Sequence, residues 1–100
     1  MTVYIVARIR IHDRAAYDRY AAKFMPVLIR YGGRLLAADE APAVLEGEAA
    51  GEKLNIIGFP DEAAARRWLD SPEYGEIAVD RLAASDGVVL LVQGFEPKRP

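Results

Sequence analysis

The chain has 100 residues, of which 52% are hydrophobic and 28% charged, with a net charge of −2 at pH 7 and no cysteine. This size and composition fit a single folded domain, which we place at residues 1–96 with a loose tail at 97–100. The slightly acidic net charge argues against a nucleic-acid partner. The lack of cysteine excludes disulfides and thiolate metal sites. No stretch approaches the roughly 20 apolar residues of a membrane span.

The N-terminal third predicts a strand followed by a helix. Residues 3–11, VYIVARIRI, alternate between a fully apolar face and a mixed face. Asp13 is a natural N-cap for a helix over residues 14–31, whose apolar side chains recur at three- and four-residue steps. Pro26 lies inside this pattern and predicts a kink rather than two helices. The glycine pair at 32–33 supplies the stop.

The middle of the chain predicts two further strands. Residues 34–39, RLLAAD, form one, and residues 54–59, LNIIGF, form the other. Between them, residues 43–48 either continue the earlier strand or pair again as a ribbon. Residues 47–52, GEAAGE, are a loop by composition.

The last third predicts an interrupted helix and a final strand. Asp61 caps a helix whose inner face includes Trp68, and a Ser-Pro step at 71–72 is a new start signal, so two short helices meet at an angle. An Asp-Gly pair at 86–87 predicts a turn, and residues 88–95, VVLLVQGF, follow as the last strand.

This order predicts a ferredoxin-like βαββαβ fold of the α+β class, with a four-stranded antiparallel sheet and the helices on one face. The other face is expected to carry Tyr4, Val6, Ile57, Phe59 and alternate members of 88–92. An exposed apolar face of several hundred Å² exceeds what soluble monomers tolerate. We therefore expect a homodimer in which a second copy packs sheet against sheet with two-fold symmetry.

Three local patterns occur together: a D-x-x-x-Y helix start at Asp13, a YGG helix stop at Tyr31 and a W-x-x-SPEY block at Trp68. With VLEGE and the closing VVLLVQGF, they make the chain resemble the bacterial domain-of-unknown-function family 1330 (DUF1330) over about residues 3–95. The resemblance implies a ferredoxin-like subunit that forms a dimeric α/β barrel. Relatives in that broader superfamily include cofactor-free monooxygenases, isomerases, dehalogenating enzymes and haem-handling proteins. The closer family has no assigned activity, so no catalytic residue is carried over.

Three side chains around the helix break are candidate ligand contacts. Trp68 and Tyr74 either line a pocket at the end of the barrel or fill the core beneath the helices. Arg81 lies on the same helical stripe as Tyr74 and therefore faces inward. It either binds an anionic group of a ligand or pairs with a structural carboxylate.

A second candidate group lies on the first and third strands. Arg8 and Arg10 alternate onto the face away from the helices, and Asn55 is expected to join them there. Inside an apolar enclosure these groups suit a small polar ligand. The alternative is a salt bridge between subunits, with Glu46 as the partner of Arg8.

The chain has a single histidine, His12, at the end of the first strand. An exposed, unused side chain is the ordinary interpretation there, although histidine is the usual acid–base group near neutral pH. One histidine and scattered carboxylates provide no metal-ligand spacing, and no flavin or phosphate-binding motif is present, so we expect no cofactor.

Together these patterns predict a small cytoplasmic homodimer that binds a small organic molecule. If the inward-facing Arg81 binds this molecule, the molecule carries an anionic group. The protein would act as a cofactor-independent oxygenase or isomerase, with Arg81, Tyr74 or His12 as catalytic candidates and Arg8, Asn55, Trp68, Tyr74 and Arg81 as ligand contacts. The alternative is a non-catalytic ligand-binding or dimerisation module.

Overall fold

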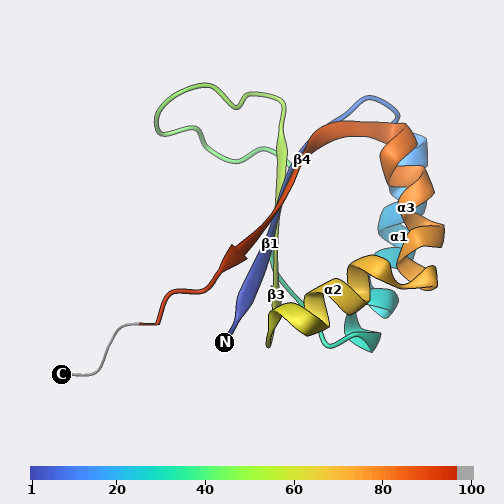
Figure 1. The fold of residues 1–100 in the computed structure, drawn as a ribbon. Helices are drawn as coiled ribbons and strands as arrows, with labels where there is room; N and C mark the ends of the chain where they lie inside the picture. The colour runs from blue at the N-terminus through green and yellow to red at the C-terminus, as the bar shows by residue number, and fades with distance from the viewer. Residues whose placement is uncertain (97–100) are drawn as a thin grey trace.

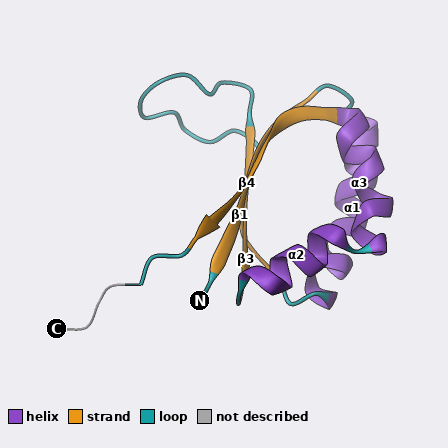
Figure 2. Ribbon diagram, viewed as in Figure 1, coloured by secondary structure: helices purple, strands orange, loops and turns teal. Residues whose placement is uncertain are grey.

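The computed structural model describes residues 1–96, to which all structural statements below refer. In chain order its elements are β1 (Val3–Ile11), α1 (Arg14–Arg30), β2 (Arg34–Asp39), β3 (Lys53–Phe59), α2 (Glu62–Asp70), α3 (Pro72–Ala84) and β4 (Ser85–Gln93). The strands form one antiparallel sheet in the order β2-β3-β1-β4, and the helices form a second layer on one face of it (Figure 1, Figure 2). This confirms the predicted ferredoxin-like α+β class. The tail predicted at 97–100 lies outside the described residues.

None of the helices within residues 1–96 combines the length and the hydrophobicity needed to cross a membrane.

Local sequence signals set the helix boundaries. The carboxylates of Asp13 and Asp61 each accept a hydrogen bond from an N–H in the first turn of the helix that follows, at 3.1 and 2.8 Å. Ser71 ends α2 and begins α3. Its hydroxyl donates to the Trp68 carbonyl at 2.8 Å and accepts from the Tyr74 N–H at 3.0 Å. This double role of one serine produces the predicted break.

The α1 helix runs through Pro26 as one helix rather than two, as predicted, and the kink expected there stays a prediction. It ends where Gly32 adopts a φ of 82°, a left-handed conformation that glycine tolerates without strain. The next residue, Gly33, is buried, and a Cβ there would collide with the side chains of Leu28 and Phe59. The glycine pair therefore combines a helix stop with close packing of the chain against the core.

Strand β1 defines the two faces of the sheet. Val3, Ile5 and Ile9 point toward the helices and are at most 2% exposed. Strand β3 pairs with β1 so that Phe59 lies opposite Val3 and Ile57 opposite Ile5. Ile57 and Phe59 are therefore core residues on the helix side, and the prediction that they lie on the uncovered face is wrong.

Two further predictions about the strands are wrong. Residues 43–48 form no strand but belong to an irregular loop that projects away from the helices (Figure 1). The Asp-Gly pair at 86–87 is not a turn, because β4 begins at Ser85, directly after α3, and ends at Gln93. Gly87 pairs with Ile9, and a Cβ on Gly87 would collide with the neighbouring β1 backbone. The glycine thus permits a close approach of two strands.

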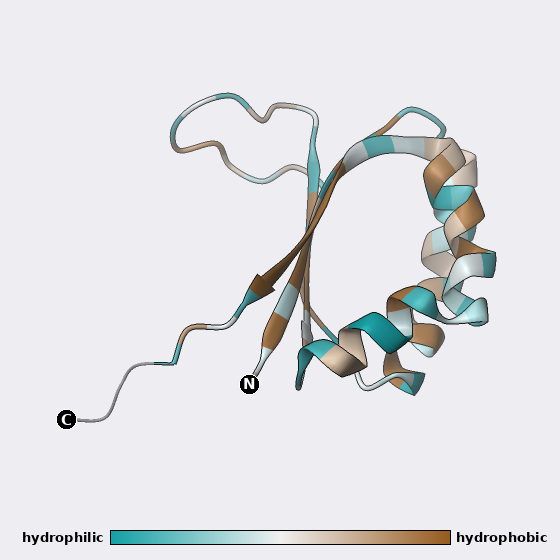
Figure 3. Ribbon diagram, viewed as in Figure 1, coloured by the Kyte–Doolittle hydropathy of each residue, from teal (hydrophilic) through white to brown (hydrophobic). Residues whose placement is uncertain are grey.

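The sheet surface opposite the helices, here called the open face, is rich in apolar side chains. Tyr4 lies beside Val92 on this face, and Val6 lies between Ile56 and Leu90. Figure 3 shows the hydrophobic colour along the C-terminal half of β4. Large apolar side chains on this face with 41% to 50% exposure are Leu36, Val88, Leu90 and Val92.

Candidate functional site

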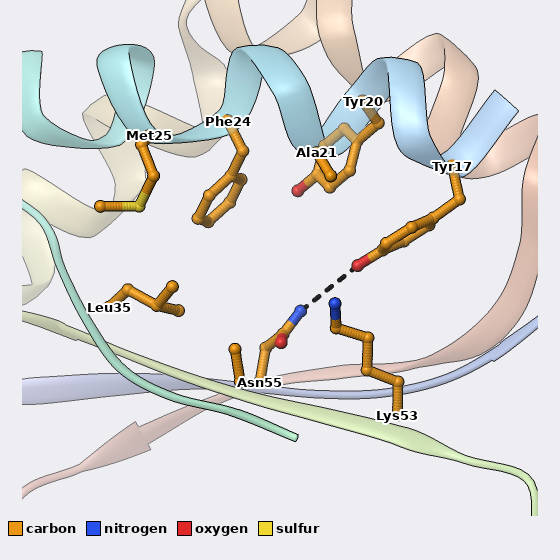
Figure 4. A pocket seen from close by; sticks show the side chains of 9 residues that line it. Tyr17, Tyr20, Ala21, Phe24, Met25, Leu35, Lys53 and Asn55 are labelled. Atoms are coloured by element: carbon orange, nitrogen blue, oxygen red, sulfur yellow. Dashed lines mark hydrogen bonds between the residues drawn. The ribbon is translucent and has the colours of Figure 1, made fainter. Parts of the chain in front are cut away.

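The space between the helices and the sheet holds a divided cavity. Its outer compartment has a volume of about 130 Å³ and lies between α1 and strands β2 and β3. Figure 4 shows Tyr17, Tyr20 and Phe24 descending into it from α1, with Lys53 and Asn55 rising from β3. Side chains of both layers thus form its walls.

The inner compartment is smaller, about 40 Å³, and lies deeper between α1, α3 and the sheet. Tyr20, Phe24 and Asn55 line both compartments, so the two compartments adjoin at these side chains. Apolar residues of β1 and β3 form the floor of the inner compartment, and α2 and α3 contribute Trp68, Tyr74 and Arg81. Four of the five predicted ligand contacts, Asn55, Trp68, Tyr74 and Arg81, therefore meet at one cavity.

Three buried side-chain atoms have no hydrogen-bond partner within residues 1–96. They are Asn55 Oδ1, Trp68 Nε1 and Arg81 Nε. All three residues line the inner compartment. A buried polar atom without a partner costs about 1–3 kcal/mol, so such atoms are rare in folded proteins unless they serve a purpose. Their convergence on one small cavity indicates a site for a polar group.

Among residues 1–96, Arg81 carries the only charge on the inner compartment. It lies in the last turn of α3 and is partly buried, and no carboxylate of the described chain approaches its guanidinium within 4.0 Å. The sequence left open whether Arg81 pairs with a structural carboxylate or with a ligand. The described residues contain no such structural partner, and an arginine side chain offers planar, directed donors to an anion.

The helix break brings the aromatic rings together. The ring centroids of Trp68 and Tyr74, which lie on either side of Ser71, are 4.1 Å apart. Trp68 is 1% exposed and also contacts Phe24 edge-on, with centroids 6.1 Å apart. Trp68 therefore fills the core beneath the helices and also lines the cavity, and its contact with a ligand at the end of a barrel stays a prediction.

The hydroxyls of Tyr20 and Tyr74 form a buried hydrogen bond of 3.2 Å. Burial raises the pKa of Tyr20 above its ordinary value, and the neighbouring Tyr74 raises it further. The Tyr20 hydroxyl therefore stays protonated at ordinary pH. It can donate a hydrogen bond or pass a proton, but it does not act as a resting phenolate base.

Sequence reasoning did not identify the outer compartment. The sequence patterns described above gave Lys53 no role. Lys53 Nζ lies 5.0 Å from the centre of the Tyr17 ring and 2.8 Å from a carboxylate oxygen of Glu40. Asn55 donates a long hydrogen bond of 3.5 Å to the Tyr17 hydroxyl (Figure 4). The period-two alternation of Lys53 with Asn55 on β3 was the available signal.

Arg8 lies on the open face, away from the cavity. Its guanidinium forms a paired contact with the Glu52 carboxylate, at 2.9 and 3.2 Å, and Arg10 donates to the same carboxylate. The predicted partner was Glu46. Arg8 lowers the pKa of Glu52, chiefly through this hydrogen bond. Asn55 does not join Arg8, because Asn55 lies opposite Ala7 and points toward the helices.

His12 is exposed and lies 3.7 Å from an Asp86 carboxylate oxygen. It lines neither compartment of the cavity. Within residues 1–96, no group of three or more His, Cys, Asp or Glu side chains is arranged to hold a metal ion.

The fold and the cavity define a small ferredoxin-like α+β protein with a polar pocket between its helices and its sheet. The chain belongs to the family described as Domain of unknown function (DUF1330), which it matches over residues 2–95. This confirms the resemblance found in the sequence. None of the curated proteins compared with the chain matches it.

Several solved structures share this fold. RPA0582, a protein of unknown function from Rhodopseudomonas palustris, is 21% identical with a TM-score of 0.79, over 96% of this chain and 84% of that one. SnoaB, a cofactor-independent oxygenase from Streptomyces nogalater, is 21% identical with a TM-score of 0.70, over 96% and 95%. Rv0793 from Mycobacterium tuberculosis is 14% identical with a TM-score of 0.61, over 99% and 100%. At these identities the similarity concerns the fold alone.

Proposed function

We propose that this protein binds a small organic molecule in the cavity between its helices and its sheet and converts it as a cofactor-independent oxygenase. The observation that carries the proposal is the convergence of three unpartnered buried polar atoms, one of them on an unpaired arginine, on an aromatic-walled cavity. Ligand sites are typically concave and apolar with a few convergent polar groups. The oxygenase named SnoaB has the same fold, which supports the choice of reaction.

The lining residues would have separate roles. Arg81 and the Trp68 indole N–H hold an oxygen-bearing, electron-rich group of the substrate and stabilise negative charge on it. Tyr20, Phe24 and Tyr74 enclose the substrate and keep water out. The hydrogen-bonded hydroxyls of Tyr20 and Tyr74 can move a proton at the substrate.

Such a reaction needs no external reductant, because the organic substrate itself reduces dioxygen. Conversion of a CH₂ group to a carbonyl consumes one O₂ and releases one water. The two C–H bonds are replaced by one C=O bond, and the second oxygen atom leaves with both hydrogens. Binding and positioning of the electron-rich substrate are therefore the main tasks of the protein.

Two measurements test this proposal. Native mass spectrometry of the freshly purified protein should detect a bound small molecule. An oxygen electrode should record O₂ uptake with at least one member of a panel of monocyclic phenols, enols and β-diketones, each tested with and without a carboxylate substituent. The Arg81→Met variant should lose at least tenfold of that rate, while Arg67→Met, which changes an exposed arginine of α2, should keep it. Uptake that is equal in wild type and Arg81→Met would contradict the assignment of the site.

The alternative function is ligand binding without chemistry. It is favoured by the exposed position of His12, which leaves the cavity without a side chain that titrates near neutral pH. Saturable binding of a panel member with no O₂ uptake and no isomerised product would support this alternative.

We further propose that the protein is a homodimer that packs through the open face. Leu36, Val88, Leu90 and Val92 lie on this face with roughly half of each side chain exposed. A stable interface buries about 800 Å² per partner, and these exposed apolar side chains would lie at its centre. Sedimentation at micromolar concentration should give the mass of two chains, and a monomer would contradict the proposal.

A further inference from the structure

The inner compartment is too small to hold a ring. Its volume is about 40 Å³, whereas a cavity known to take up benzene measures about 150 Å³. The outer compartment, at about 130 Å³, is close to that size. A cavity measured in this way needs about 10–15 Å³ to hold one water molecule, so the inner compartment accommodates a group of about three heavy atoms. The unpartnered polar atoms therefore face a small substituent rather than the body of a ligand.

The hydrogen-bond donors that line the inner compartment favour an oxyanion as the bound group. Trp68 Nε1 and Arg81 Nε are donors that cannot accept a hydrogen bond. The Asn55 amide becomes a third donor after a half-turn about its last bond, and its oxygen then accepts from the Tyr17 hydroxyl instead. Trp68, which is 1% exposed, is fixed in place by its aromatic neighbours.

The charges around the cavity agree with this selection. Within the described part of the chain, Arg81 is the only charged residue that lines the inner compartment, and Lys53 is the only one that lines the outer compartment. No Asp or Glu of residues 1–96 lines either compartment, so an anion meets no like charge from these residues. A carboxylate fits both the volume and the donors, because it offers two acceptor oxygens to two donor side chains, Arg81 and Trp68.

The outer compartment complements a flat apolar body. Tyr17, Tyr20 and Phe24 present aromatic rings to it, and Met25 and Leu35 complete its apolar wall (Figure 4). Aromatic pairs gain about 0.5–1.5 kcal/mol beyond simple burial. This space adjoins the inner compartment at Asn55, which lines both.

We propose that the ligand is a monocyclic aromatic carboxylic acid, bound with its carboxylate in the inner compartment on Arg81 and Trp68 and with its ring in the outer compartment. This inference rests on the proposed function, since it names the substrate class of the same cavity. It also assigns the orientation: the acid group lies inward, and the far edge of the ring points toward Lys53.

The test uses the intrinsic fluorescence of Trp68, the only tryptophan of the chain, as a reporter within the inner compartment. The probes are benzoate, its neutral isostere benzamide, and acetate, which has the carboxylate without the ring. In the wild type, benzoate should bind at least tenfold more tightly than either benzamide or acetate. In Arg81→Met, benzoate should lose its advantage over benzamide, while Arg67→Met should behave as the wild type.

A second variant keeps the test decisive if Arg81→Met does not fold. Ala7 lies on β1 and lines the inner compartment, so Ala7→Val reduces its volume without changing any charge. The preference for benzoate should disappear in this variant as well. Equal affinities of benzoate and benzamide would overturn the carboxylate assignment and leave ring binding intact. Equal affinities of benzoate and acetate would overturn the placement of the ring in the outer compartment. If no ring compound perturbs Trp68, the proposed function fails together with the inference.

Discussion

Replacing Arg81 by methionine should make the unliganded protein more stable. An arginine that binds a ligand lacks its partner when the site is empty, whereas a structural arginine has one within the chain. Arg81 Nε is buried without a hydrogen-bond partner in the described residues. Methionine has a similar length and flexibility, so it can keep the contacts of the arginine stem without the unpaired charge.

The magnitude follows from the cost of an unsatisfied buried donor, about 1–3 kcal/mol. Arg81 is only partly buried, so we expect the lower end, a gain of about 1 kcal/mol. For a domain of this size that corresponds to a rise in Tm of about 4–8 °C. A substitution that removes function and raises stability is typical of a binding site whose side chains lower the stability of the unliganded fold.

The assay is urea unfolding at pH 7 of ligand-free protein, followed by circular dichroism. Protein concentration is held constant because association would shift the transition. The control Arg67→Met alters an exposed arginine and should stay within about 0.5 kcal/mol of the wild type. A loss of more than about 1 kcal/mol in Arg81→Met would refute the reasoning, because it would show that Arg81 stabilises the fold.

Three further predictions concern the core, the dimer and pH. Gly33→Ala should lower the free energy of unfolding by about 1–3 kcal/mol, because the added Cβ collides with core side chains. The control Gly75→Ala adds its Cβ in open space on a helix, so it should be neutral or stabilising in the same urea titration. Leu90→Lys should convert the proposed dimer to a monomer in sedimentation velocity. The control Leu82→Lys, on the outer side of α3, should leave the dimer unchanged. A Leu90→Lys protein that sediments as a dimer would contradict the proposed interface. Hydrogen bonds from two basic side chains lower the pKa of Glu40 to about 2, from an ordinary value of 4.5. The Glu40 carboxylate therefore contributes stability above about pH 4.5, and this contribution is lost as the pH falls toward 2. The unfolding free energies of wild type and Glu40→Gln should differ by up to about 1 kcal/mol at pH 7 and converge near pH 2. Parallel curves would exclude this linkage.

Helix boundaries could be predicted because their signals are local. Asp13, Asp61 and Ser71 cap the helices that follow them, as their positions in the sequence indicated. The faces of β3 could not be predicted in this way. Leu54 and Ile56 share one parity and Ile57 and Phe59 the other, so the strand is apolar on both sides. Only its pairing with β1 decides which set is buried.

The candidate site shows the same division between local and long-range information. Arg81, Trp68 and Tyr74 could be selected because a helical stripe and a Ser-Pro break are local patterns. Asn55 was selected for the wrong face, and Lys53 was not selected at all, because both depend on the register of β3. The cavity itself arises from packing between distant segments, which no periodicity in the sequence records.

The central claim is that the inner compartment holds the polar group of a ligand. The most direct measurement is a ¹⁵N NMR titration with benzoate, because Trp68 supplies the only indole N–H signal of the chain. We predict that the indole N–H signal of Trp68 and the Nε–H signal of Arg81 both shift saturably with benzoate. An indole signal that stays fixed up to saturating benzoate would contradict it.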